Sequence, residues 1–281
     1  ASVDLNSYYL QGGYFAKNTS VKLIAFAGKE KTYHAWGYAT KEEMEKFGRR
    51  YNPCGEMYTD ADGNKHYYTD QTDNYLQKNY QLLLNHSFST AWNLNVALHY
   101  TKGDGYYEEY KPGSSLVEYG LKPFNPDGTE TNESDLVRQK KMDNKFGGGV
   151  FSLNYTGNRL TASLGGGLNQ YRGNNFGKVT WVKNYIGNLS PEHEYYRNKS
   201  KKTDGNIYLK ANYDLTSTLS AYADLQYRHI DYTIDGVNDK YDWNKNALRP
   251  LAVDKKFDFF NPKVGLNWNI TPNHRLYASF S

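Results

Sequence analysis

The chain has 281 residues, 28 of them tyrosine, with a formal net charge of +4. Its mean hydropathy is −0.86, and no segment approaches the roughly 18 consecutive apolar residues of a membrane-spanning helix, which excludes a helical membrane protein. The modest charge comes without a basic stripe or an RNA-binding motif, which argues against nucleic acid as a partner. The single cysteine, Cys54, excludes an internal disulfide framework.

Apolar and polar residues alternate along pairs of segments that are joined by turns of a few residues. In the clearest pair, Phe146–Tyr155 and Leu160–Tyr171, the apolar residues fall on one face because successive strand side chains point to opposite faces. The pattern predicts about ten antiparallel strands. Besides the pair just named, the predicted strands include the segments around Tyr8–Phe15, Leu94–Tyr100, Ile207–Tyr213, Leu219–Tyr227 and Arg275–Ser281.

Short turns and long polar segments follow one another in a regular order. The predicted short turns are Ala16–Ser20, Ser89–Ala91, Thr156–Arg159, Asp214–Thr218 and Thr271–His274. The predicted long loops run from 37 to 74, 103 to 143, 172 to 203 and 231 to 256. This order is typical of an antiparallel transmembrane β-barrel with long extracellular loops. The first and last strands place both chain ends on the long-loop side, so residues 1–281 are predicted to form a single partial barrel domain of a larger barrel.

A soluble β-sandwich or a lipocalin-like barrel would show the same alternation. Strands of roughly 9 to 13 residues are longer than usual in soluble sheets and match tilted membrane strands. Aromatic residues near both strand ends also favour the membrane, as two interfacial girdles. These are Tyr14, Phe15, Phe88, Trp92, Tyr155 and Trp268 at one end, and Tyr106, Tyr107, Tyr171, Tyr227 and Phe257 at the other.

Five segments resemble TonB-dependent outer-membrane receptors of the Bacteroidetes. They are Gly28–Trp36 (GKEKTYHAW), Gly105–Tyr110 (GYYEEY), Tyr227–Tyr232 (YRHIDY), Phe260–Leu266 (FNPKVGL) and Leu276–Ser281 (LYASFS). The resemblance implies the middle portion of a barrel of about 22 strands, closed by a plug domain that this chain lacks. It also implies the outer membrane of a Gram-negative bacterium, with membrane lipids, the plug, the TonB complex (through the missing N-terminal part) and a small-molecule ligand as partners.

On this resemblance the expected function is active uptake of a scarce nutrient, a metal chelate such as a siderophore or haem, or cobalamin, with no cofactor and no enzymatic activity. One alternative is a glycan- or peptide-importing receptor paired with a surface lipoprotein. Another is a passive porin, whose wall would look the same. A third is an omptin-like outer-membrane protease, prompted by His229 and Asp231 at a strand rim, where such a pair could activate water.

The loops carry local signals of their own. Thr40 and Glu43 form a capping box that predicts a short helix to Phe47, and Asp62-Gly63 predicts the turn of a surface hairpin. Asp60, Asp62 and Asn64 do not have the calcium-loop spacing, and no metal site is expected. The run Glu192-His193-Glu194 is interpreted as a solvated loop, since its spacing defines no coordination geometry.

Ligand recognition is expected on the loops, because binding residues concentrate on loops held by a rigid scaffold. The candidates are aromatic residues that would stack on a planar ligand and arginines that would attract an anionic one. They are Arg49, Arg50, Tyr106, Tyr107, Tyr110, Trp181, Tyr195, Tyr196, Tyr241 and Trp243. A separate prediction concerns how two strands pair. If Tyr155 lies opposite Leu160, the glycine triplets 147–149 and 165–167 face each other. They would then form either a patch without side chains or a bend in the sheet.

Overall fold

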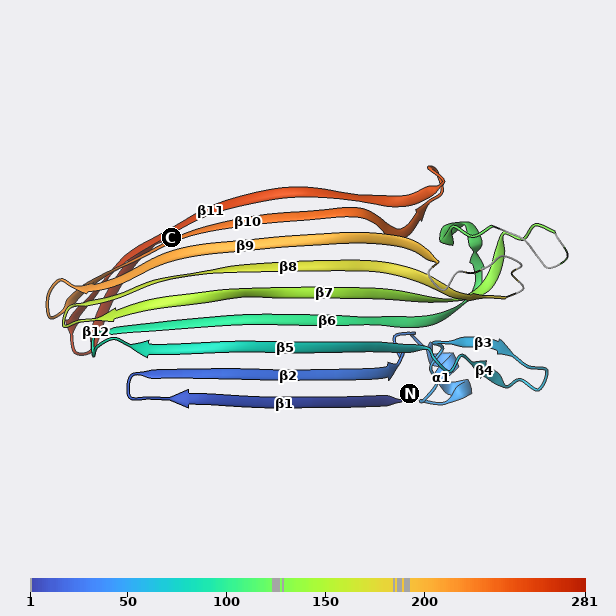
Figure 1. Cartoon of the computed structure of the whole chain (residues 1–281), viewed down its shortest axis with the longest axis horizontal. Helices are drawn as coiled ribbons and strands as arrows, with labels where there is room; N and C mark the ends of the chain where they lie inside the picture. Colours follow the sequence, from blue (N-terminus) through green and yellow to red (C-terminus); the bar gives the residue numbers. More distant parts are fainter. Residues whose placement is uncertain (1, 123–126, 128, 184, 186–188, 190–192) are drawn as a thin grey trace.

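Ten strands form one antiparallel sheet in the computed structural model (Figure 1), which describes residues 2–122, 127, 129–183, 185, 189 and 193–281. Along the sheet the order follows the chain, and a separate hairpin is inserted after the second strand. The strands are β1 (Val3–Phe15), β2 (Thr19–Tyr33), β5 (Thr72–Ser87), β6 (Trp92–Ser115), β7 (Glu133–Thr156), β8 (Leu160–Val182), β9 (Glu194–Asp214), β10 (Leu219–Asp242), β11 (Ala247–Thr271) and β12 (His274–Phe280). The predicted ten-stranded antiparallel sheet is confirmed.

The segment between β2 and β5 holds the predicted helix and hairpin. Helix α1 (Lys41–Phe47) is capped by Thr40, whose hydroxyl accepts the Glu43 N–H at 3.2 Å while Glu43 accepts the Thr40 N–H at 2.8 Å. The hairpin is β3 (Glu56–Thr59) and β4 (Lys65–Tyr67). Both predictions are therefore confirmed. No helix in the described part of the chain is long and apolar enough to span a bilayer.

The predicted loop boundaries are wrong at three of the four long loops, because the strands continue far into them. Strands β6 to β11 contain 21 to 25 residues each. The supposed loop 231–256 is mostly a continuous hairpin, with only 243–246 between β10 and β11. Backbone hydrogen bonds hold two adjacent strands together whatever their side chains are. The paired strands therefore extend beyond the residues whose apolar alternation was used to predict the strand ends.

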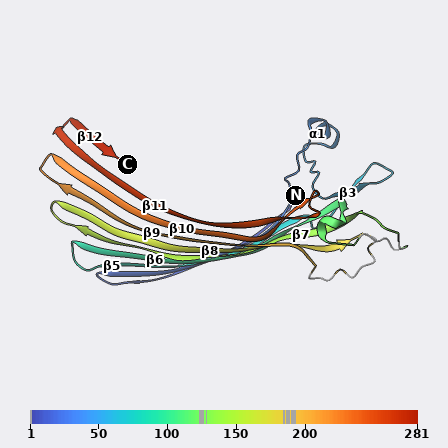
Figure 2. The same ribbon diagram turned by 90° about the horizontal axis from the view of Figure 1, so that it is seen from above.

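The sheet has one apolar and one polar face, and its polar face is concave. Lys22 on β2 and Tyr208 on β9 line one hollow of about 520 Å³, so the intervening strands curve around that face. There, the Asn85 side-chain amide donates to Asn95 Oδ1 at 2.6 Å. The convex face carries an apolar band, defined here as Leu10, Leu23, Leu82, Leu84, Val96, Leu98, Phe151, Leu153, Leu164, Leu168, Ile207, Leu209, Leu225, Val264, Leu266 and Leu276. Figure 2 shows the sheet also bending along its strands.

Aromatic residues border the band at both edges, but not all of the predicted ones. Tyr14, Trp92, Tyr155 and Trp268 stand on the convex face near the short turns, as predicted. Phe15, Tyr107, Tyr171 and Phe257 were wrongly assigned, since the register places them on the concave face. Toward the long loops the predicted Tyr106 and Tyr227 do lie on the convex face, together with Tyr8, Tyr80, Tyr100 and Phe260.

The predicted register of β7 with β8 is wrong by two residues. Tyr155 pairs with Ala162, not Leu160, because the turn is tighter than predicted: the Gly157 N–H donates to the Leu160 carbonyl at 2.8 Å. The two glycine triplets are consequently staggered, with Gly149 opposite Leu168. A shift of two residues leaves every side chain on its predicted face, because strand side chains alternate with a period of two.

One of these glycines allows two polar side chains to meet across a strand. On the concave face His99 of β6 and Asn169 of β8 both pair with Gly148, and His99 Nε2 lies 2.8 Å from Asn169 Oδ1. A Cβ atom at position 148 would lie 2.3 Å from the Leu168 carbonyl oxygen and 2.4 Å from Asn169 Oδ1. The bond therefore depends on the absent side chain.

Gly148→Ala is expected to destabilise the barrel by about 1–3 kcal/mol, because the added methyl overlaps backbone that cannot move freely. The thermal midpoint of the detergent-solubilised protein measures this. The matched control is Gly28→Ala on β2, also on the concave face, where nothing lies within 4 Å of the position that the added methyl group would take. Equal midpoints for the two variants would contradict the close approach.

Candidate ligand-binding site

A cleft of about 430 Å³ lies at the long-loop end of the concave face and is called the loop-end cleft here. Two consecutive rows of concave-face residues form most of it, and Asn74, Tyr106 and Lys141 of the convex face also line it. The outer row is Asp73, Tyr107, Lys140, Gly177 and Tyr196 on β5 to β9. The inner row is Glu30, Tyr75, Gly105, Met142 and Asn175 on β2 to β8.

Glycines in these rows make room for the tyrosine rings. A Cβ atom on Gly105 would lie 2.8 Å from the Tyr75 ring, and one on Gly177 would lie 2.4 Å from the Tyr196 ring. Both rings therefore occupy space that a side chain at the glycine would fill. The cleft is a product of alternating large and absent side chains on adjacent strands.

Lys140 places a positive charge at the cleft, and its amine forms an ion pair with Asp239 of β10. Burial is the largest influence and lowers the pKa of Lys140, but the interactions of its ammonium with Asp239 and Tyr107 together raise the pKa above its ordinary value. The amine lies 5.7 Å from the centre of the Tyr107 ring, within cation–π range. With Glu30 and Asp73 also at the cleft, carboxylates outnumber this cation.

A buried ion pair supports the cleft from the loop side. The Arg138 Nε–H donates to Glu109 Oε1 at 2.6 Å, and a terminal nitrogen donates to the Tyr119 hydroxyl at 3.1 Å. Only 13% of the Arg138 side chain and 11% of the Glu109 side chain are exposed. Arg138 and Trp243 line a second hollow of about 790 Å³.

Beside this pair is the main hydrophobic core, which lies at the long-loop end and not behind the apolar band. It comprises Leu116, Tyr119, Leu121, Leu136, Val179, Val182, Tyr195 and Tyr196. Leu136 and Val179 are 0% and 1% exposed. The outer ends of β6 to β9 are thus packed as in a soluble domain and form a rigid base for the cleft.

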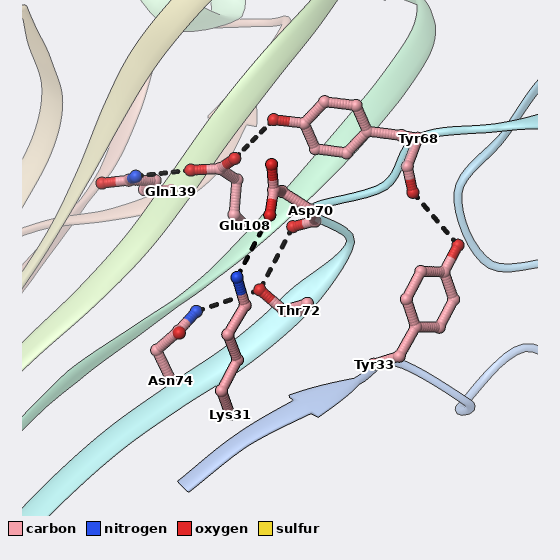
Figure 3. A network of polar contacts seen from close by, with 8 residues as sticks. All are labelled: Lys31, Tyr33, Tyr68, Asp70, Thr72, Asn74, Glu108 and Gln139. Carbon is pink, nitrogen blue, oxygen red and sulfur yellow. Dashed lines mark hydrogen bonds and ion pairs between the residues drawn. The ribbon is translucent and has the colours of Figure 1, made fainter. Parts of the chain in front are cut away.

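Hydrogen bonds of Tyr68 hold the segment between β2 and β5 against β2 and β6 (Figure 3). The Tyr68 hydroxyl donates to one carboxylate oxygen of Glu108, and the Gln139 amide donates to the other, both at 2.5 Å. Tyr33 donates to the Tyr68 carbonyl at 3.2 Å. Cys54 is buried, where its Sγ accepts the Gly37 N–H at 3.0 Å, so it contributes to the packing of this segment.

The sequence-predicted ligand residues separate into groups. Tyr106, Tyr107 and Tyr196 all line the loop-end cleft, but only Tyr107 and Tyr196 lie on its concave face. Tyr106 alternates onto the convex face, where Lys141 Nζ lies 4.2 Å from its ring centre. Tyr195 belongs to the hydrophobic core. Tyr110 is buried with its ring 6.4 Å from that of Trp181.

The remaining predicted residues lie elsewhere at the long-loop end. Tyr241 and Trp243 contact each other at the tip of β10, with ring centres 4.9 Å apart. Arg49 and Arg50 are exposed after α1 and do not line the cleft. The structure therefore does not bring the eight predicted aromatic residues together at one site.

Sequence reasoning missed Glu30, Asp73, Tyr75, Lys140, Met142 and Asn175. Their alternation places them on the polar face, and continuing that alternation outward would have separated Tyr107 from Tyr106. That these residues lie side by side on adjacent strands, by contrast, follows only from the strand register.

Other candidate sites are resolved by their hydrogen bonds. His229 pairs with Asp258 and not with Asp231, because Nδ1 lies 2.7 Å from Asp258 Oδ1 on the convex face. Glu192 lies outside the described residues, and Glu194 forms an ion pair with Arg197. Asp60 accepts the Asn64 N–H at 2.8 Å, and its pKa is lowered to about 2, foremost by its bond to His66. This matches the interpretation of that segment as a turn.

His34 connects the first loop to the cleft and predicts a pH dependence. Its ring is 3% exposed, stacks on Trp36 at 3.7 Å and lies 5.6 Å from Tyr107. Among the described residues neither ring nitrogen has a hydrogen-bond partner. Burial lowers its pKa, against the opposing pull of the Asp73 and Glu109 carboxylates.

Below a pH of about 6.5 the unfolded segment binds a proton that the packed His34 resists, so stability falls as the pH falls. We expect the amide protection factors of segment 34–71, which are exchange rates corrected for their intrinsic pH dependence, to be lower at pH 5 than at pH 7.5. The variant His34→Phe keeps the ring without the nitrogens and should lose this dependence. An unchanged pH dependence in that variant would rule out His34 as its source.

The chain matches the TonB dependent receptor-like β-barrel family over residues 25–281. It superposes on the ferric-catecholate import receptor Fiu of E. coli K12 with a TM-score of 0.58 and 13% identity, covering 99% of this chain and 46% of that one. For the ferric citrate transporter FecA the TM-score is 0.61 and the identity 9%, with 99% and 35% covered. For the ferripyoverdine receptor of Pseudomonas aeruginosa the values are 0.55 and 14%, with 99% and 35% covered. No curated protein sequence matches significantly.

The chain spans between about a third and a half of these receptors, and at such low identity the likeness shows the fold. The long antiparallel strands and the two-faced curved sheet agree with that fold. In an outer-membrane barrel the convex apolar band faces lipid and the concave polar face lines the interior. By its family match over residues 25–281, the chain belongs to the TonB-dependent receptors, as part of their outer-membrane β-barrel.

Proposed function

We propose that this chain is part of the wall of a TonB-dependent receptor that imports a metal chelate (a siderophore or haem) or cobalamin. The loop-end cleft carries the proposal: three tyrosines and a lysine converge on the concave face, where a ligand entering the barrel would pass. Solved receptors with this fold include importers of ferric catecholates and ferric citrate. The long loops then face outward, and a plug and further strands complete the barrel.

The charge of the cleft limits the classes of ligand that it would bind. On the concave side of the cleft, Glu30, Asp73 and the Lys140–Asp239 pair leave an excess of carboxylates, while Lys141, which also lines the cleft, lies beside Tyr106 on the convex side. This excess disfavours a strongly anionic chelate. Tyrosine rings favour flat or cyclic ligands by stacking. We therefore expect a chelate without excess negative charge, such as a neutral ferric hydroxamate, or cobalamin.

The Bacteroidetes resemblance of the five sequence segments supports a receptor of that type. The second candidate function, on the same resemblance, is import of glycans or peptides together with a surface lipoprotein. Co-purification of such a lipoprotein with the receptor would favour this second function. Against a protease, His229 faces the lipid side and is engaged by Asp258. A passive porin would need no TonB complex.

Uptake by metal-starved cells tests the proposal. Deleting the gene should abolish uptake of one compound from a panel of radiolabelled ferric hydroxamate, ferric catecholate, ferric citrate, haem and cobalamin. Inactivating TonB should abolish the same uptake, because energy for transport comes from the inner membrane. Uptake of the whole panel unchanged by the deletion would refute the proposal, and uptake independent of TonB would favour a porin.

A further inference from the structure

Five cations form an unbroken row across the convex face, each directly paired with the next on the neighbouring strand. The pairs are Lys78–Lys102, Lys102–Lys145, Lys145–Arg172 and Arg172–Lys201. We call these five residues, on β5 to β9, the cation row. Four of them are exposed, and Lys102 is half-buried.

One convex position separates the cation row from the apolar band on β5, β6 and β8. On β6 the convex side chains run Leu98, Tyr100 and Lys102 from the band toward the long loops. Tyr80 and Gln170 occupy the same intermediate height on β5 and β8. The positive charges therefore stand where the lipid-facing surface gives way to the headgroup layer.

Within the protein, this arrangement is unfavourable by itself. Like charges directly opposite on adjacent strands repel, because their Cβ atoms lie about 4.5–5.5 Å apart. In the described part of the chain none of the five forms an ion pair with a carboxylate. Asp104 and Asp143 stand in the next row outward, but they oppose each other and leave the row with a net positive charge.

The row is also local. At the same height, Lys201 is followed by Thr233 on β10 and Asp254 on β11. Asp231 and Lys256 pair nearby and make that part of the wall mixed in charge. A general preference for basic residues above the band would not stop at β9, so the row marks one sector of the barrel.

We propose that the cation row binds the phosphates of anionic lipid headgroups, whose acyl chains lie on the apolar band below. Neighbouring strands are about 4.8 Å apart, so five cations extend over about 19 Å, longer than one phosphate. The row thus suits a lipid with several phosphates or a file of lipids with one each. Lysine and arginine beside a membrane surface attract anionic headgroups in this way.

Co-purification of lipid tests the proposal on the full-length receptor in mild detergent. Phosphate-bearing anionic lipid is quantified by mass spectrometry for wild type and for K102Q/K145Q/R172Q/K201Q. The matched control K22Q/K202Q/K210Q/K263Q removes four cations from the concave face of the same sheet. We expect the row variant to retain about tenfold less anionic lipid, and the control to match wild type.

Equal anionic lipid in both variants, or equal loss, overturns the proposal. Loss of a co-purifying protein in place of lipid also overturns it. A second measurement applies even if the row variant folds poorly: wild-type receptor should melt at a higher temperature in nanodiscs with anionic lipid than in purely zwitterionic ones, and 0.5 M salt should remove the difference. If inorganic phosphate alone in detergent reproduces the stabilisation, the row is a free-phosphate site and the lipid assignment fails.

Discussion

Replacing Arg138 with leucine is expected to destabilise the long-loop end of the sheet by about 3–5 kcal/mol. The substitution leaves the Glu109 carboxylate, 11% exposed, without its cation, and breaking a buried pair from one side costs about that much. It also removes the hydrogen bond to the Tyr119 hydroxyl. Faster hydrogen exchange in the outer halves of β6 and β7 would measure the loss locally.

Two controls separate the buried charge from a general loss of contacts. The double variant Glu109→Gln/Arg138→Met should recover much of the stability, since no unpaired charge remains. Lys31→Leu breaks the exposed pair with Asp70, whose side chains are 48% and 54% exposed, and should cost at most about 1 kcal/mol. If the Arg138 and Lys31 variants behaved alike, the Arg138–Glu109 pair would not support the cleft as argued.

Tyr107→Ala is expected to weaken ligand binding about 30-fold, while Tyr106→Ala leaves it unchanged. The two residues are adjacent in sequence and chemically identical, but only Tyr107 reaches the concave face beside Lys140. Removing a central aromatic contact typically costs about 2 kcal/mol, or roughly 30-fold in affinity. This prediction rests on the proposed function.

The measurement is titration of the full-length receptor with whichever panel compound requires the gene for uptake, a ferric hydroxamate or cobalamin first. Tyr107→Phe keeps the ring and should bind nearly as well as wild type if stacking dominates. Equal weakening by both alanine substitutions would place the ligand away from the loop-end cleft. Unchanged uptake in the gene deletion would instead refute the receptor proposal itself, so the two failures are distinguishable.

Much of the barrel wall could be predicted from local pattern. The alternation of Leu94, Val96, Leu98 and Tyr100 assigns each side chain to a face without knowledge of any partner strand, because the period of two belongs to the backbone. The capping box at Thr40 and the Asp62-Gly63 turn are equally local and are both present. Strand ends were predicted poorly, since hydrogen-bonded ladders continue where alternation ends.

The sequence by itself therefore determined the antiparallel sheet, its two faces and the family resemblance, all of which depend on neighbours along one strand. Only the tertiary structure decided which residues of different strands lie next to one another. The tight turn at Gly157 staggers the glycine triplets, and the register of five strands brings Tyr107, Lys140 and Tyr196 to one height. Register is set by turn geometry and strand pairing together, and these join residues that are distant in the chain. The cleft and the cation row are both consequences of that alignment.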